Sequence, residues 1–216
     1  LAGACVAING GFGGIDLAQI NKVLLGLLFS SAVGFVCGYG TSKATVAAFS
    51  GIERDKSEGF FKISQIASSA VMAFMHGAQD TQKFAGVLTL EMLMMGGGRA
   101  GEWVFPVCAV IMSLGTALGG GRIIKTVGID MIKMQTYQGF AADAAGGFCL
   151  FLSTVFGFPV STTHTKTTAV MGVGAAKSLR SVDWSVAGDM AAAWLFTFPG
   201  CGILGWLISC IYLRVF

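Results

Sequence analysis

Three polar side chains that could do chemistry interrupt a long apolar stretch, residues 63–95. They are His76, Asp80 and Lys83, and on a helix their i, i+4 and i+7 spacing places them on one face. Asp80 offers hard oxygen ligands for Na⁺, or a carboxylate that can carry a proton. Two interpretations are open. One is a cation or proton site at Asp80 beside a helix break at Gly77, and the other is a structural Asp80–Lys83 ion pair with His76 packed against it.

A cluster of hydroxyl side chains follows Pro159. Pro159 is predicted to end one helix, and Ser161 or Thr162 is predicted to cap the next. The first turn of a helix leaves backbone N–H groups free and carries the positive end of the helix dipole, so it binds anions, phosphate above all. The alternative is that these hydroxyls only bond to backbone carbonyls in a kinked helix.

The other reactive residues give weaker signals. Asp143 begins an apolar stretch, where it is either a favourable charge at a helix N-terminus or a ligand of a coupling ion. Ser161 and His164 could touch, but no carboxylate nearby in sequence orients the histidine, so a nucleophilic enzyme is not expected. The six cysteines form no CxxC pair, and we expect them to pack as small apolar side chains. The sequence therefore predicts neither an enzyme nor a bound cofactor.

The composition places these polar groups in a membrane. Only 12% of the 216 residues are charged and 54% are hydrophobic, whereas about a quarter of a soluble domain is charged. A net charge of +3 is too small to indicate a nucleic-acid-binding protein. Four stretches without a charged side chain are long enough to cross the hydrocarbon core as helices, and they are residues 23–42, 103–121, 144–165 and 190–213. The chain is therefore predicted to be an all-α, multi-pass integral protein of the plasma membrane or an organellar membrane.

Less apolar segments divide the chain. Residues 1–21 are rich in glycine and are predicted to be a connector, which leaves residues 22–216 as the transmembrane domain. Residues 51–62 carry several charges and are predicted to form a solvated loop. The polar breaks at Gly77 and Pro159 would then interrupt two helices at membrane depth. Secondary transporters build a site at the bilayer midplane in this way.

Four segments carry a resemblance to a known family. The first is His76-Gly77-Ala78-Gln79-Asp80-Thr81-Gln82-Lys83, which resembles the His-Gly-Ala-Asn-Asp-x-x-Lys motif of the inorganic phosphate transporter (PiT) family. The second, residues 158–164, resembles the Pro-Val-Ser-Thr-Thr-His motif of the same family. Residues 120–128 and 138–143 are similar to its connecting segments, in the order found in its C-terminal half. The resemblance runs from about residue 60 to the end of the chain.

The resemblance implies a secondary transporter of two inverted halves, which holds its anion between broken or re-entrant helices in the lipid bilayer. Family members couple phosphate uptake to Na⁺ or H⁺, and some relatives carry sulfate. By position, Asp80 and Asp143 would bind the coupling ion, with Asp80 as the Na⁺ ligand. The implied contacts to inorganic phosphate are Gln79, Thr81, Gln82, Lys83, Ser161, Thr162 and Thr163.

Two features depart from the family pattern. Gln79 stands where the motif has Asn, and its extra methylene would displace a ligand oxygen, which bears on the choice or affinity of the ion. The chain also covers about half of the pattern, so we expect a missing N-terminal half or a second copy to complete the site. Two alternatives stay open: a sulfate symporter on the same scaffold, and a non-transporting membrane receptor or subunit in which Asp80 and Ser161 are dispensable.

Overall fold

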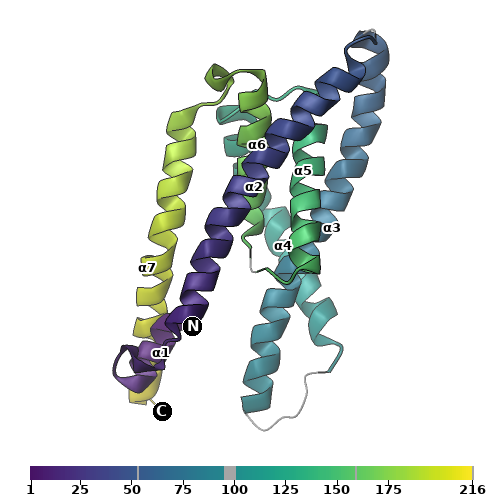
Figure 1. Cartoon of the computed structure of the whole chain (residues 1–216). Helices are drawn as coiled ribbons and strands as arrows, with labels where there is room; N and C mark the ends of the chain where they lie inside the picture. Colours follow the sequence, from purple (N-terminus) through teal and green to yellow (C-terminus); the bar gives the residue numbers. More distant parts are fainter. Residues whose placement is uncertain (53, 95–100, 159, 216) are drawn as a thin grey trace. The chain divides into compact units, whose positions relative to one another are not determined.

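The chain folds into helices. The computed structural model describes residues 1–52, 54–94, 101–158 and 160–215, and for residues 54–56 it describes the backbone alone. These described residues form helices and no strand (Figure 1), which confirms the predicted all-α class. They divide into two compact units, one made of Leu1–Leu24 with Trp184–Phe216 and the other of Leu25–Asp183.

In the first unit a short helix packs on a long one. Helix α1 (Ala2–Asn9) lies along α7 (Trp184–Val215), and Pro199 lies inside α7. Gly3 faces the backbone of Gly202 so closely that a Cβ atom would collide with the Gly202 carbonyl. The segment expected to be a connector therefore contains a packed helix.

The second unit brings two helices together through glycines. Helix α2 (Leu17–Phe49) contributes its residues from Leu25 onward, and α6 (Thr162–Lys177) packs against it. A Cβ atom at Gly38 of α2 would collide with the carbonyl of Ala169, and one at Gly172 of α6 would collide with the carbonyl of Phe35. Small residues let membrane helices approach in this way.

Helix α3 (Arg54–Met94) is continuous over 41 residues, roughly 60 Å. The predicted break at Gly77 is therefore wrong, as is the predicted loop over residues 51–62, because α3 already begins at Arg54. A glycine inside a helix costs only about 1 kcal/mol, and the packing of α3 along α5 (Thr136–Val155) offsets that cost (Figure 1).

The break in the structure comes after α5. Helix α5 ends at Val155, Gly157 adopts the left-handed conformation (φ 66°), and α6 begins at Thr162. Glycine takes this conformation without steric cost, so it commonly ends a helix. The predicted helix stop at Pro159 lies outside the described residues. The break places the end of one helix beside the start of the next.

The remaining elements complete the multi-pass arrangement. They are α4 (Val104–Lys125), a π-helical turn η2 (Thr126–Asp130), and the 3₁₀ turns η1 (Phe12–Gly14) and η3 (Leu179–Ser181). Within the described ranges, three helical segments are long and apolar enough to cross a membrane, namely Leu17–Phe49, Val104–Asp130 and Trp184–Val215. The chain is thus an integral membrane protein with several spans.

Candidate functional site

Asp80 is the centre of a polar cluster on α3. Its Oδ1 atom lies 2.9 Å from Nζ of Lys83, and its Oδ2 atom lies 3.3 Å from Nε2 of His76. The Asp80 side chain is 18% exposed, so these partners replace most of its water. The three residues share one helix face, as their spacing predicts, and the Asp80–Lys83 ion pair of the alternative interpretation is present.

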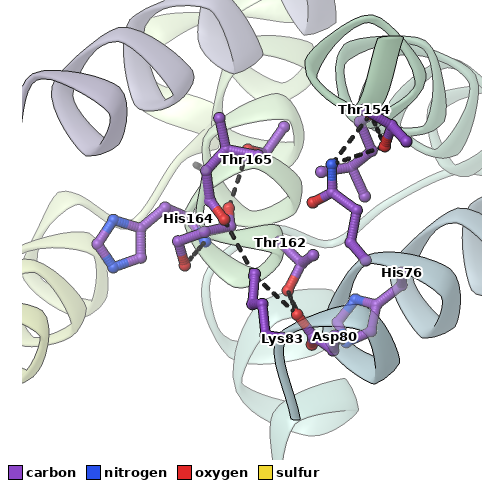
Figure 2. A network of polar contacts seen from close by, with 11 residues as sticks. His76, Asp80, Lys83, Thr154, Thr162, His164 and Thr165 are labelled. Carbon is purple, nitrogen blue, oxygen red and sulfur yellow. Dashed lines mark hydrogen bonds and ion pairs between the residues drawn. The ribbon is translucent and has the colours of Figure 1, made fainter. Parts of the chain in front are cut away.

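The start of α6 lies against this cluster (Figure 2). The Thr162 hydroxyl donates to Asp80, 3.2 Å from Oδ2, and Thr162 is almost fully buried. Lys83 also donates to the backbone carbonyl of Val160 at 3.1 Å. Two residues of α3 therefore hold the first residue of α6 and the segment just before it.

Ser161 caps α6. Its side-chain oxygen accepts the N–H of His164 at 3.3 Å, and its carbonyl accepts the N–H of Thr165 at 3.0 Å. The predicted cap is confirmed at Ser161, which is preferred at this position because its hydroxyl satisfies a free N–H group. Figure 2 shows the His164 imidazole directed away from Asp80. The positive end of the α6 dipole thus lies at the Asp80 cluster.

Gln79 reaches the other side of the break, the last turn of α5. Its side-chain nitrogen donates to the carbonyl of Leu150 at 3.1 Å and to Oγ1 of Thr154 at 2.9 Å. Its side-chain oxygen is buried and, among the described residues, has no hydrogen-bond partner. Thr154 was not singled out from the sequence, because nothing local distinguishes it from other hydroxyls that bond within a helix.

Asp143 forms a second polar cluster on α5. Its carboxylate accepts a hydrogen bond from the Ser69 hydroxyl of α3 and lies 3.6 Å from Nζ of Lys166 of α6. Sequence reasoning missed both partners. Ser69 precedes Asp80 by 11 residues, close to three full turns of α3, so its place on the same helix face was a usable signal.

The other predicted contacts lie apart from these hydrogen bonds. Thr81 is buried, whereas the side chains of Gln82 and Thr163 are exposed. None of the three takes part in the described hydrogen bonds to Asp80 or Asp143. The structure therefore unites Asp80, Lys83 and Thr162, with Ser161 and Gln79 beside them.

The donor and acceptor groups of this site suit ions of both signs. Across the described ranges, no three His, Cys, Asp or Glu side chains gather as a metal site. A cation at Asp80 would instead need neutral oxygens, and the Thr162 hydroxyl and the Val160 carbonyl lie within the same cluster. The start of α6 and the Lys83 ammonium favour an anion.

Comparison with known proteins gives consistent matches. The profile of the phosphate transporter family matches residues 42–205. The chain is 32% identical over 209 residues to a probable low-affinity inorganic phosphate transporter of Bacillus subtilis, covering 95% of this chain and 62% of that protein. It is 33% identical over 220 residues to a protein of the same description from Mycobacterium leprae, covering 98% of this chain and 53% of the relative. The chain thus spans between half and two thirds of the length of these relatives.

A solved structure has the same fold. It is described as a sodium-dependent phosphate transporter and superposes with a TM-score of 0.66 at 20% sequence identity, covering 100% of this chain and 64% of the other. At this identity the likeness concerns the fold. The family profile covers most of the chain and its matched range contains both polar clusters. The chain belongs to the phosphate transporter family.

Proposed function

We propose that the chain forms part of a secondary transporter that imports inorganic phosphate together with Na⁺ or H⁺. One observation carries the proposal: Lys83 and Thr162, two donors suited to an oxyanion, are both bound to the Asp80 carboxylate at the start of a helix. A carboxylate at an anion-binding helix end repels the anion unless a positive charge joins it. The substrate anion and its coupling cation therefore belong to one cluster.

Coupling follows from competition for Asp80. The Asp80–Lys83 pair carries no net charge, so an anion arriving alone would be uncompensated. A cation or proton on Asp80 would weaken the hold of the carboxylate on Lys83 and Thr162, which frees the ammonium and the hydroxyl for phosphate. Because linkage is reciprocal, bound phosphate would raise the affinity for the cation by the same factor.

The remaining predicted residues take supporting places in this proposal. Ser161 and Thr163 would contribute donors at the start of α6, and Gln79, Thr81 and Gln82 would border the anion from α3. Asp143, held by Ser69 and Lys166, is the candidate for a second coupling ion. Hard oxygen ligands suit Na⁺, and a carboxylate suits a proton.

The chain would supply one of two sets of site residues. Transporters of inverted repeats hold their substrate at the repeat interface, with broken helices from both, and the sequence has one His-Gly-Ala-x-Asp run. We propose that residues 22–216 form one transmembrane repeat and that a second repeat or a second copy completes the site.

Uptake into vesicles that carry the complete carrier tests the proposal. Radiolabelled phosphate should accumulate in response to an inward Na⁺ or H⁺ gradient, and unlabelled phosphate should compete better than sulfate. Preferential sulfate uptake would favour the sulfate symporter. Absence of uptake of either anion, with Asp80 and Ser161 dispensable for the protein's biological effect, would favour the receptor or subunit.

A further inference from the structure

The orientation of the Gln79 amide is determined by its neighbours. The carbonyl of Leu150 can only accept a hydrogen bond. The Thr154 hydroxyl already donates to that same carbonyl at 2.9 Å, so its oxygen can only accept from Gln79. Both neighbours therefore need the amide nitrogen, which lies 3.1 Å and 2.9 Å from them. If the amide were flipped, its oxygen would face the Leu150 carbonyl and the Thr154 oxygen, neither of which can donate to it. Oε1 must therefore point away from Leu150 and Thr154.

This orientation leaves a buried acceptor without a donor. Gln79 is 7% exposed, and its Oε1 atom has no hydrogen-bond partner among the described residues. A buried acceptor left unpaired destabilises the folded protein, so a donor from a bound ligand would be favourable there. The amide of Gln79 lies at the last turn of α5, and the neighbouring Asp80 carboxylate lies at the first residue of α6. Two neighbouring residues of α3, each with an acceptor oxygen, thus contact the two sides of the break between α5 and α6.

We infer that Gln79 Oε1 accepts a hydrogen bond from a protonated oxygen of the transported anion and so selects phosphate against sulfate. The inference rests on the proposed function. Phosphate at neutral pH carries at least one O–H group, which can donate to Oε1, whereas sulfate carries none. A fully enclosed site that hydrogen-bonds a hydroxyl of its ligand rejects analogues without that hydroxyl by roughly 10⁴–10⁵-fold. The analogue leaves the polar groups of the site unpaired.

The inference gives each atom of the amide a separate role. The nitrogen donates hydrogen bonds that hold α3 against the end of α5. The oxygen accepts a hydrogen bond only from an anion that carries a proton. A cation could also use the oxygen as a ligand, and this is the competing outcome of the experiment. The anion is favoured at Oε1 because the proposed function already assigns the coupling cation to the Asp80 carboxylate, and because the positive end of the α6 dipole and the Lys83 ammonium attract an anion.

Inhibition of labelled phosphate uptake by matched anions is the decisive experiment. Arsenate retains the O–H donor of phosphate, whereas monofluorophosphate has fluorine in its place and sulfate has no donor. In the complete carrier, arsenate should inhibit within a few-fold of phosphate. Sulfate and monofluorophosphate should inhibit at least about 100-fold more weakly than phosphate. This factor is smaller than for a fully enclosed site because Asp80 is partly exposed. Inhibition by either within about threefold of phosphate would overturn the inference.

Variants assign the selectivity to the residue. Gln79→Met retains length but removes both amide atoms, and the loss of the oxygen should lower the ratio of sulfate to phosphate inhibition constants by about tenfold or more. A purely structural role would weaken all anions equally and leave that ratio unchanged, which contradicts the inference. A changed Na⁺ dependence with the ratio unchanged would make Oε1 a cation ligand and also contradict it. Gln19→Met, at an exposed amide of the other unit, is the matched control.

Wild-type carrier that takes up no phosphate would overturn the proposed function and this inference together.

Discussion

The Thr162 hydroxyl and the Asp80 carboxylate, 82 positions apart in the chain, lie 3.2 Å apart and join the first residue of α6 to the middle of α3. Hydrogen bonds to an ionised group are shorter and stronger than neutral ones. This bond directs the hydroxyl at Asp80 while the carboxylate is charged and free of a cation. In the proposed mechanism, the state of Asp80 therefore determines whether the Thr162 hydroxyl at the start of α6 can turn to the substrate.

Replacing Asp80 with Asn tests the coupling role of the carboxylate. Asn keeps the shape and can still accept from Thr162, but it has no charge to bind a cation or proton. We expect Asp80→Asn to abolish cation-driven phosphate uptake while the protein still inserts, as measured by uptake along an imposed Na⁺ or H⁺ gradient. Asp189→Asn, at an exposed carboxylate of α7, should retain normal uptake. An Asp80→Asn carrier with unchanged cation dependence would exclude this role.

Replacing Thr162 with Val tests the anion role of its hydroxyl. Val conserves the shape of Thr, and a hydrogen bond to a charged group contributes about 1.5–3 kcal/mol. Phosphate affinity should therefore fall about tenfold in Thr162→Val, and at least as far in a double variant with Thr163→Val, as read from the concentration dependence of uptake.

The control for this prediction is a threonine whose hydroxyl bonds only within its own helix. The Thr197 hydroxyl bonds to the carbonyl of Ala193 inside α7, so Thr197→Val removes a hydroxyl that serves only the backbone. Its phosphate affinity should stay normal. If Thr162→Val and Thr163→Val together also leave the affinity unchanged, the hydroxyls at the start of α6 take no part in anion binding.

Much of the polar site could be predicted from sequence because it follows from local spacing. His76, Asp80 and Lys83 share a face through helical periodicity, and Ser161 caps α6 through its own side chain. Thr154 and Lys166 could not be assigned in this way, and for Ser69 the spacing predicts only its face of α3 and not its partner. Their partners lie on other helices, and only the packing of α3, α5 and α6 brings them together.

The predicted break in α3 failed for a related reason. Polar residues around Gly77 suggest an interruption when they are judged against lipid. In the structure these residues bond to one another and to α5 and α6, so the helix need not open to satisfy them. Likewise, Phe60 and Phe61 at the start of α3 pack on Phe49, which supports helix where charge alone predicted a loop.

The glycine contact between α2 and α6 predicts a position-specific loss of stability. A Cβ atom at Gly38 would collide with the Ala169 carbonyl, whereas one at Gly40 meets nothing within 4 Å. Gly38→Ala should destabilise the protein by about 1–3 kcal/mol through overpacking. Gly40→Ala should be neutral or stabilising by roughly 0.5–1 kcal/mol, since alanine favours a helix interior. Thermal unfolding in detergent measures both, and equal effects would contradict the close approach of the two helices.

The Asp143–Lys166 pair predicts an asymmetry between its two members. The Asp143 side chain is 12% exposed and that of Lys166 is 46% exposed. Lys166→Met leaves the largely buried charge of Asp143 with Ser69 as its remaining bonded partner. We expect this variant to lower the free energy of unfolding by about 1–3 kcal/mol, less than the 3–5 kcal/mol lost when a fully buried pair is broken. Asp143→Asn leaves a lysine that can reach water, so it should cost less than about 1 kcal/mol.

Combining the two changes separates a charge effect from a packing effect. The double variant removes both charges, so its unfolding free energy should return close to that of Asp143→Asn alone. The same thermal unfolding series reports it as a double-mutant cycle. If the losses of the two single variants simply add, then the pair makes no electrostatic contribution and Lys166 acts through packing.

The last prediction concerns what residues 1–216 do without other chains or repeats. A site between inverted repeats needs broken helices from both, and the described part of this chain provides one such break, between α5 and α6. Reconstituted alone in liposomes, the chain should insert but should not accumulate labelled phosphate under a cation gradient, whereas the complete carrier should. The two preparations are compared at equal protein content, and cross-linking reports their oligomeric state. Uptake by a cross-linked dimer would show that a second copy completes the site, and gradient-driven uptake by a strict monomer would refute the need for a second set of site residues.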